Sequence, residues 1–547
     1  EGGPVMPPSG SRWWRQARGH AVRSLIRRAE GLPGPGRRLL RDGFTALPEW
    51  TPGKDSMRRI AGQTRPRRRD GDESPPQKAT PRRRPPGGYG GYLHWSDAGS
   101  TYSEREIATF LQLELAHLKQ ALYAEPLPPL EPTGYEEEDA SNAEDRIAEY
   151  LDLVEDSSVA EGDVSHLVIL NQYPKVGAEY GNGFVHRRVK YYIEAGVRVH
   201  VAVVNASEEP SSYVYDGVPV LVGRGAEARR LLETTAYTSV STHFLQPYIW
   251  RQVREAMRGH RLFSFMHGFE SRRWIRTIRN YRSPEPLANG IKDSLTRQRF
   301  WREVLNDPAG PEKFVFVSRW WRRGAQDDLE MVFPEQRVAV VHNVIDTELF
   351  RFHEKDPAQR FRLLWVRSAA NLNYASDLAV AALVRLRETE WWPQLDIRII
   401  GDGKYFGAFE ETFADDENVV VERRFASQAE IARLHREYGM FLVPTRWDSQ
   451  GVSRDEAMAS GLVAVTNAAC AVPEFVDSSC AVVAPPEDVE GLVAGMIRVF
   501  ESPELFLRLA RAGAQRVAAA TSPTHTVMRE MALMGLLPES GGSEASS

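Results

Sequence analysis

Cysteine is nearly absent from this chain of 547 residues, which contains only Cys470 and Cys480. So few thiols suit a reducing compartment and exclude a framework of several disulfide bonds. The sequence also has no group of cysteines and histidines with the spacing of zinc ligands. A small disulfide-rich fold and a structural zinc domain are therefore both disfavoured.

Long apolar runs are also missing. No uninterrupted run approaches the roughly 20 residues that a membrane-spanning helix requires. The N-terminal part is rich in arginine from Arg12 onward and lacks the central apolar stretch of a secretory signal. We therefore expect a cytoplasmic protein. Its length predicts two to four domains, and 42% hydrophobic residues suffice for sizeable cores.

The net charge of −5 hides an uneven distribution along the chain. Residues 1–100 contain 20 Lys and Arg against 9 Asp and Glu, so the remainder is acidic. Within the basic part, residues 65–91 combine two arginine triplets with prolines and glycines. Such a composition buries too little apolar surface to offset the entropy of ordering, so residues 1–97 are predicted to be mostly disordered.

One stretch of this basic arm, Arg12–Glu30, has apolar residues at helical spacing with arginines between them. A basic amphipathic helix of this kind could lie on an anionic membrane surface, which would make the protein peripheral on the inner face of the membrane. A solvated helix or a poorly ordered arm is the alternative. Nucleic acid is not expected as a partner, because no recognisable binding module accompanies the arginines.

A second helix is predicted where Ser103 and Glu106 form a capping box before an apolar stripe at 107–122. This stripe indicates packing or self-association and carries no chemistry. Acidic residues at 136–139 then form a linker, which leads to a short helix near Ile147 to Val154.

From about residue 164, apolar strands alternate with helices over about 350 residues, the pattern of doubly wound α/β units. This length is too great for one such sheet, so we expect two domains, separated near the proline- and glycine-rich segment 306–312. The expected organisation is a basic arm (1–97), a helical and acidic linker (98–163), two Rossmann-like domains (164–310 and 311–521) and a C-terminal helix with a flexible tail (522–547).

The strongest chemical signal lies between Pro444 and Gly461. A predicted strand, Met440 to Val443, runs into a loop, and a helix begins near Val452. Ligands of open α/β sheets bind at the carboxyl ends of strands, and helix N-termini attract anions. Asp448 and Glu456 are eight positions apart and can span a sugar nucleotide. The loop acid would reach the sugar hydroxyls, and the helix acid the ribose diol.

Asp448 and Glu456, with Ala457-Met458-Ala459-Ser460-Gly461 after them, resemble the motif of the retaining glycosyltransferases of family four, the glycosyl transferases group 1. Asp448 stands where glutamate is commoner, which shortens the reach by one methylene. Other segments resemble the family in the same order, namely Phe314–Ser318, His342–Asp346 with Phe350, Leu364–Arg367 and Ile399–Gly403. The resemblance implies the GT-B fold, an α/β fold in which two Rossmann-like domains face a cleft.

The family's pattern also assigns roles to residues. Asp448 and His267 are expected to be catalytic. The donor-binding set that the resemblance implies is Glu456, Arg367, Asn373, Gln450, Gly451, Val452, Ser453, Gly401 and Gly403. Arg367 corresponds to an arginine that contacts the donor diphosphate, but the lysine usual in the family aligns with Asn373. Losing that cation should weaken leaving-group stabilisation. Candidates to replace it are Lys404, Arg319, Arg322 and Arg323.

The acceptor side is predicted from the first Rossmann-like domain. A glycine-rich loop after its first strand contains Gly181, Asn182 and Gly183, which would let backbone approach a phosphate. The loop lacks the spacing of dinucleotide-binding motifs, which disfavours a nicotinamide cofactor, and a merely flexible loop is the alternative. His267 and Glu270 sit where the family often places a histidine at the reaction cleft, and His243 ends another predicted strand.

The implied reaction moves a hexose-like unit from a nucleoside diphosphate sugar to the hydroxyl of a glycan or lipid-linked acceptor, with retained configuration. The residues from Asp448 to Ser453 look like those of a subgroup that acts on cell-surface polysaccharides. The resemblance implies neither a bound metal nor another cofactor. Two alternatives remain: a catalytically degenerate GT-B scaffold, or another GT-B sugar-nucleotide enzyme such as an epimerase or a phosphorylase.

Overall fold

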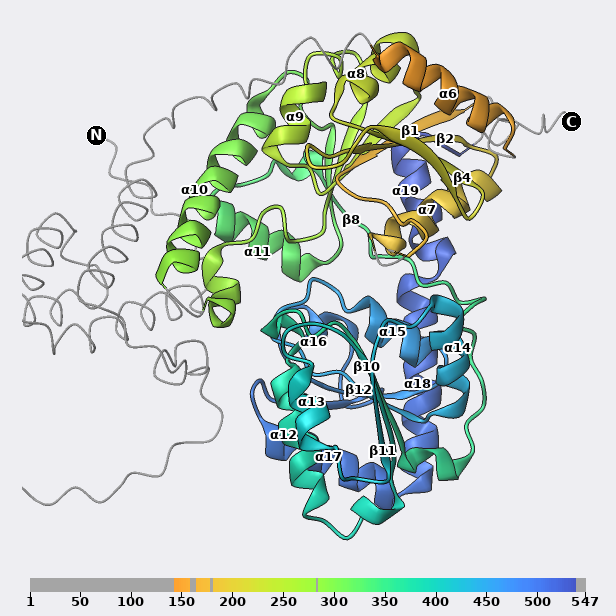
Figure 1. Ribbon diagram of the computed structural model, residues 1–547, viewed down its shortest axis with the longest axis vertical. Coiled ribbons are helices and arrows are strands. Elements are labelled where there is room, and N and C mark those ends of the chain that lie inside the picture. Colours follow the sequence, from red (N-terminus) through yellow and green to blue (C-terminus); the bar gives the residue numbers. More distant parts are fainter. Residues whose placement is uncertain (1–141, 158–163, 178–180, 282–283, 538–547) are drawn as a thin grey trace, which may run out of the picture. The chain divides into compact units, whose positions relative to one another are not determined.

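The computed structural model describes residues 142–157, 164–177, 181–281 and 284–537 (Figure 1). The predicted helices at Arg12–Glu30 and 103–123 and the acidic linker at 136–139 lie outside these residues. The short helix expected near Ile147 is confirmed as α6 (Ala143–Glu155).

Residues 273–296 belong to a separate compact unit and are described by themselves. They contain the 3-10 helix Trp274–Asn280 and the first part of α10 (Pro284–Asn306). The main-chain N–H of Trp274 donates to Ser294 Oγ at 2.9 Å, which joins these two elements.

The first sheet has eight strands in the order β3-β4-β2-β1-β5-β6-β7-β8. All neighbours are parallel except β3 and β4, which are antiparallel. The strands are β1 (Ser165–Leu170), β2 (Arg198–Val204), β3 (Ser211–Tyr215), β4 (Val218–Gly223), β5 (Ser239–His243), β6 (Leu262–Met266), β7 (Lys313–Phe316) and β8 (Val338–Val340).

The second sheet has six parallel strands in the order β11-β10-β9-β12-β13-β14. Its strands are β9 (Arg362–Val366), β10 (Asp396–Gly401), β11 (Val419–Arg423), β12 (Met440–Leu442), β13 (Val463–Asn467) and β14 (Val482–Ala484). Two Rossmann-like sheets were expected, and this part of the prediction is confirmed.

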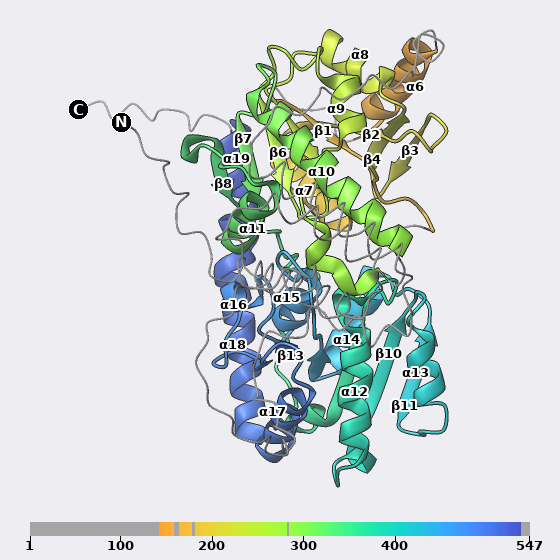
Figure 2. The same cartoon turned by 90° about the vertical axis from the view of Figure 1, so that its left-hand side faces the viewer.

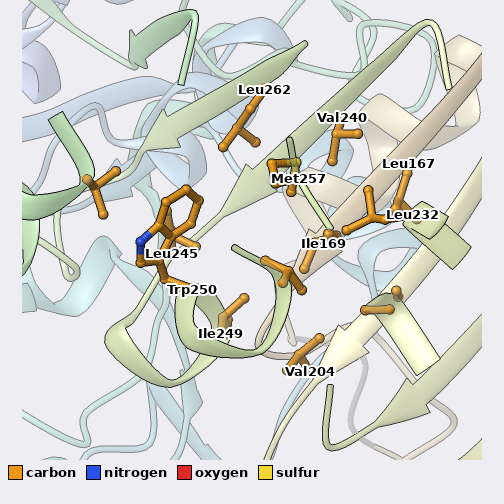
Figure 3. Packing of buried hydrophobic residues seen from close by; sticks show 14 of the residues in the cluster. Leu167, Ile169, Val204, Leu232, Val240, Leu245, Ile249, Trp250, Met257 and Leu262 are labelled. Carbon is orange, nitrogen blue, oxygen red and sulfur yellow. The ribbon is translucent and has the colours of Figure 1, made fainter. Parts of the chain in front are cut away.

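Hydrophobic packing explains the continuous apolar runs of the strands. Strands covered by helices on both faces bury alternate side chains against opposite layers, so nearly every residue is apolar. Figure 3 shows part of one such layer, a cluster of buried residues that includes Leu167 and Ile169 of β1, Val240 of β5, and Ile249 and Trp250 of α9 (Pro247–Val253). These five side chains are almost completely buried.

Helices surround both sheets. Around the first are α7 (Gly183–Glu194), α8 (Ala226–Thr234), α9, the part of α10 from Arg297 to Asn306, and α11 (Arg319–Leu329). The second is accompanied by α12 (Ser376–Arg387), α13 (Gly407–Thr412), α14 (Gln428–Glu437), α15 (Val452–Ala459), α16 (Val472–Phe475), α17 (Val489–Glu501) and α18 (Pro503–Thr521). Figure 2 shows α17 and α18 beside β13, where both helices make contact with that strand. Among the described residues, no helix combines the length and apolar character needed to cross a membrane.

The predicted domain boundary at residues 310 and 311 is wrong. Phe314–Ser318 was expected to open the second domain, but β7 pairs in parallel with β6 of the first sheet. β8 pairs with β7 in turn, so the second sheet begins only at β9. The segment 307–311 is the short loop from α10 into β7. Proline and glycine interrupt a chain in the same way at such a loop as between domains.

The last helix, α19 (Val527–Met534), returns to the first sheet after α18. Val527, Met531 and Met534 are buried in the same core as Val168 of β1 and Val185 of α7. Figure 1 shows α19 beside α7, in agreement with the contacts between these helices. The helix expected in residues 522–547 is therefore present, and it completes the first domain.

Candidate functional site

The carboxyl ends of β10, β9 and β12 lie next to one another, because these strands are neighbours in the parallel second sheet. The loop after β9 carries Arg367 and Asn373, the loop after β10 carries Gly403, and the loop after β12 leads through Asp448 into α15. Most of the predicted donor-binding residues therefore come from one edge of the sheet, where ligands of such sheets bind.

Arg367 and Asp448 contact each other at this edge. The Nη2 atom of Arg367 lies 3.4 Å from Asp448 Oδ2, and Nη1 donates to the main-chain oxygen of Pro444 at 2.9 Å. The guanidinium stands over the ring of Tyr374, 4.3 Å from its centroid. Burial lowers the pKa of Arg367, and the charge of Asp448 opposes this shift. Arg367 is therefore a buried cation held beside the loop carboxylate, unlike an exposed arginine at a strand end.

Asn373 joins the loop after β9 to the loop after β12 through its main chain. Its carbonyl oxygen accepts hydrogen bonds from the N–H of Arg446 at 2.7 Å and of Trp447 at 3.1 Å. The hydroxyl of Thr445 donates to the same oxygen at 3.1 Å. The predicted donor contact of Asn373 stays a prediction, but its backbone evidently positions the residues just before Asp448.

Gly401 and Gly403 permit close packing of the loop after β10. A Cβ atom at Gly401 would clash with the main-chain oxygen of Arg367, and one at Gly403 with the backbone of Ala370. Gly403 also has a φ of +131°, which L side chains rarely adopt. Both glycines are thus required by the approach of two loops, whether or not they also contact a donor.

The start of α15 is shaped for an anion. Gly451 is its N-cap with a φ of 105°, and no side chain caps the helix there. The first N–H groups of a helix, here those around Val452 and Ser453, have no intrahelical acceptor. Together with the helix dipole, they favour negative charge. The predicted contacts of Gly451, Val452 and Ser453 with a diphosphate fit this geometry.

Gln450 uses its side chain within the protein. Its Oε1 accepts from the N–H of Asn343 at 2.6 Å, and its Nε2 donates to Asn343 O at 3.1 Å and to Asp455 Oδ2 at 3.2 Å. The amide therefore links the segment after β8 to α15. A donor contact of Gln450 would have to come from its main chain.

Glu456 is paired with an arginine that the sequence analysis did not identify. Glu456 as a whole is 4% exposed, and its Oε1 lies 2.7 Å from Nη2 of Arg187 on α7. Burial raises the pKa of Glu456, and the charge of Arg187 opposes this shift. Arg187 also donates to Gln428 Oε1 at 2.6 Å. No local pattern distinguished Arg187 from its neighbour Arg188, because its partners come from a distant part of the chain.

His267 and His243 form a buried pair. Nε2 of His267 lies 2.9 Å from Nδ1 of His243, and the rings are stacked with centroids 5.2 Å apart. Burial, which is the largest cause, lowers the pKa of both histidines well below the usual value, and Arg188 adds to the effect. Both rings are therefore neutral at pH 7. Within the described part of the chain, His267 Nδ1 has no hydrogen-bond partner.

Glu270 closes the loop that follows His267. Its carboxylate accepts hydrogen bonds from the main-chain N–H groups of His267 and Gly268. Burial raises the pKa of Glu270 to about 7, against the effect of these N–H groups. A Cβ atom on Gly268 would clash with the ring of Trp447, the residue before Asp448. The loop after β6 thus packs directly on the loop after β12.

The glycine-rich loop of the first domain leads into α7. Residues 178–180 are outside the described ranges, but Gly181, Asn182 and Gly183 are not. Asn182 has a φ of 61° and donates from Nδ2 to Gln172 O at 2.8 Å. A Cβ atom on Gly183 would meet nothing within 4 Å, so the space beside it is open. This turn also sets the position of Arg187, one helical turn further along.

The four cations proposed to replace the missing lysine make other contacts. Lys404 Nζ stands 4.9 Å from the centroid of the Tyr405 ring. The main-chain N–H of Arg319 donates to Glu474 Oε1 at 3.0 Å, and its Nε lies 3.9 Å from the same oxygen. Arg322 pairs with Glu335. Arg323 donates from Nε to Arg319 O at 3.4 Å. No group of three or more His, Cys, Asp or Glu side chains in the described ranges is arranged to hold a metal ion.

Residues 360–502 match the family of glycosyl transferases group 1. A curated relative, the MMP alpha-(1->4)-mannosyltransferase of Mycolicibacterium hassiacum, is 30% identical over an alignment of 267 residues, and the match covers 42% of this chain. The match spans 60% of that relative's length.

Two solved structures have a similar fold. Sucrose-phosphate synthase from Thermosynechococcus elongatus has a TM-score of 0.53 at 13% identity, covering 68% of this chain and 99% of that one. The catalytic domain of starch synthase IV from Arabidopsis thaliana, bound to ADP and acarbose, has a TM-score of 0.51 at 11% identity, with coverages of 68% and 99%. At these identities the likeness concerns the fold alone, and it agrees with the expected GT-B arrangement.

Proposed function

We propose that this chain, whose residues 360–502 match the glycosyl transferases group 1 family, transfers a sugar unit from a nucleoside diphosphate sugar to an acceptor hydroxyl with retained configuration. The observation that carries the proposal is the placement of two acids around one helix N-terminus. Asp448 precedes α15, Glu456 lies within it, and Gly451 leaves its start without a side-chain cap.

The donor is proposed to lie along this element. Glu456 would accept hydrogen bonds from the ribose diol, while the N-terminal N–H groups of α15 and the Arg367 guanidinium would face the diphosphate. Asp448 would hold the hydroxyls of the sugar, because it lies beside Arg367 at the other end of the loop. Fixed donors aimed at the leaving diphosphate stabilise the charge that develops on it.

The acceptor hydroxyl would lose its proton to the departing phosphate, so no side chain needs to be the base. His267 fits a neutral role, because burial lowers its pKa well below the usual value. Its Nδ1 atom has no partner among the described residues and would exchange a hydrogen bond with the sugar or the acceptor. An imidazolium acting as general acid is not expected at neutral pH.

Mannose is the first donor sugar to consider, because the curated relative is a mannosyltransferase. A glycan or lipid-linked acceptor, within cell-surface polysaccharide synthesis, is our proposal from the residues Asp448 to Ser453. A cytoplasmic protein bound to the inner face of the membrane through Arg12–Glu30 would meet a lipid-linked acceptor there. Liposomes of anionic lipid at low salt test this part, and failure to bind them would remove it.

The test measures nucleoside diphosphate release from a panel of UDP-, GDP- and ADP-sugars, with and without glycan or lipid-linked acceptors. Turnover that requires an acceptor and is abolished in Glu456→Ala supports the proposal. Glu411→Ala, at an exposed position on α13 in the same domain, is the matched control and should be as active as the wild type. Binding of nucleotide without turnover would instead indicate a degenerate scaffold. Turnover of the donor without acceptor would point to a different sugar-nucleotide enzyme.

A further inference from the structure

Arg187 stands at the proposed donor site, yet it comes from the first domain. We propose that Arg187 is a donor-binding residue and supplies to the diphosphate the cation that Asn373 cannot provide. This inference rests on the proposed function and adds to it a ligand contact made from α7.

The guanidinium of Arg187 is incompletely used. Its Nη2 atom contacts Glu456 at 2.7 Å and Gln428 at 2.6 Å. Its Nη1 atom is buried and has no hydrogen-bond partner within residues 142–537 as far as they are described. A buried donor without an acceptor is costly, and more so when it carries charge. A ligand oxygen placed there would remove this cost, and a phosphate oxygen suits it best.

Glu456 can hold a ribose while Arg187 remains in place. An ionised carboxylate offers about four lone-pair positions. The closest approach of Arg187 is to Oε1, so acceptor positions of the carboxylate remain for the hydroxyls of a diol. A ribose bound at Glu456 would bring its 5′ phosphate toward the same guanidinium. The ion pair therefore organises the site for a nucleotide and does not need to break when one binds.

Other cations near the site are less suited to this role. Arg367 is already assigned to the proposed diphosphate and is held there by Pro444 O and Asp448, so it does not replace the cation that Asn373 lacks. Arg188, next to Arg187 on α7, is directed into the core, where its Nε donates to Glu530 Oε2 at 3.1 Å and its Nη1 to Asn343 Oδ1 at 3.1 Å. Of these three arginines, Arg187 combines contact with Glu456 and an unsatisfied N–H.

A guanidinium from α7 on the diphosphate would make the nucleotide bridge both domains. Affinity should then depend on the number of phosphates far more in this protein than in a variant that lacks Arg187. Calorimetric titration measures this directly with three probes that share one base: the nucleoside, its monophosphate and its diphosphate. The base is the one whose diphosphate binds best among uridine, guanosine and adenosine.

Arg187→Met is expected to lower the affinity for the diphosphate by about 10- to 100-fold, the loss typical of a hydrogen bond to a charged group. Affinity for the nucleoside should change less than about 3-fold, because Glu456 and the helix remain. Lys190→Met, on the same helix but paired with Asp216, is the control and should bind all three probes normally. Arg187→Lys should retain part of the preference for the diphosphate, and adding Asn373→Lys to Arg187→Met should restore part of it.

Equal losses for the nucleoside and the diphosphate in Arg187→Met would overturn the inference, because Arg187 would then only brace Glu456. Unchanged diphosphate binding would overturn it as well. If Arg187→Met does not fold, Arg187→Lys is the test. A ratio of nucleoside to diphosphate affinity equal to that of the wild type would then count against a contact of Arg187 with the diphosphate. A wild-type protein that binds diphosphate but transfers no sugar would refute only the proposed function. A wild-type protein that binds no diphosphate would refute both.

Discussion

His243 Nδ1 and His267 Nε2 share one hydrogen bond at 2.9 Å, so the protonation of one ring fixes the other. Both rings are neutral, and one nitrogen of the pair must donate while the other accepts. If His243 donates, His267 carries its proton on Nδ1 and offers a donor to the substrate; if it accepts, His267 Nδ1 is an acceptor. If His267 faces the substrate as proposed, His243 would orient its ring through this hydrogen bond.

His243→Asn should therefore retain more activity than His243→Phe, because the amide can keep a hydrogen bond near Nδ1. We expect kcat to fall by about 10-fold in His243→Phe with little change in KM, and by about 100-fold in His267→Ala. Steady-state kinetics with the best donor of the panel measure both. Equal loss in the Asn and Phe variants would show that His243 acts through packing alone.

Asp448 and Glu456 should separate sugar recognition from nucleotide recognition. Asp448→Asn is expected to lower kcat/KM by about 100-fold while the affinity for the free nucleoside diphosphate stays within about 3-fold, because the proposed contact is with the sugar. Glu456→Gln should lower the affinity for the free nucleoside diphosphate and the affinity for the nucleoside by similar factors. Kinetics and calorimetry on both variants give the comparison. The reverse pattern would mean that the two acids have been assigned to the wrong ends of the donor.

Gly268→Ala should disturb the packing of Trp447 as well as the backbone. The new Cβ would clash with the Trp447 ring, and the φ of Gly268, +127°, is one that L side chains rarely adopt. Gly217→Ala is the matched control, since its φ is +75° with nothing within 4 Å. We expect urea denaturation to show a loss of about 1 kcal/mol for Gly217→Ala and about 2–4 kcal/mol for Gly268→Ala. Similar losses for the two variants would contradict a contribution from the Trp447 contact.

Arg188 and Glu530 form a buried ion pair at 3.1 Å, to which Tyr192 adds a hydrogen bond at 2.7 Å. Removing one charge leaves the other buried without its partner, so Arg188→Met should destabilise the protein by about 3–5 kcal/mol. The double variant Arg188→Met with Glu530→Met should be more stable than either single one. Thermal unfolding of the three variants is the measurement. A double variant less stable than both single ones would contradict the cost assigned to the unpaired buried charge.

The buried histidine His435 should make stability depend on pH. Burial lowers its pKa from 6.5 to about 3, with Lys355 adding to the effect. The unfolded chain therefore binds a proton that the folded protein does not bind between these values. Stability from this group is complete above pH 6.5 and falls as the pH decreases, by about 2 kcal/mol at pH 5. Denaturation at pH 7 and pH 5 should show a smaller difference in His435→Asn, whereas His525→Asn, at an exposed site, should match the wild type.

Sequence alone predicted the alternating elements and the helix that begins near Val452, because continuous apolar runs and a helix start depend on local residues. It assigned Phe314–Ser318 to the wrong domain, since a strand's sequence does not reveal which neighbours it will pair with. Gln450 was expected at the donor, but its amide is satisfied by Asn343, which local sequence could not show. Arg187 was missed for the same reason: its partner Glu456 belongs to a different domain.

The packing of α19 on the first sheet has a consequence for biosynthesis. Met531 and Met534 fill the same core as Val168 of β1, although they are among the last described residues to leave the ribosome. The second domain, from β9 to α18, is complete before them. Part of the core of the first sheet therefore stays uncovered until translation has passed residue 534. A premature stop after α18 would release a chain whose second domain can fold, but whose first domain lacks α19 and the side chains that this helix adds to the core.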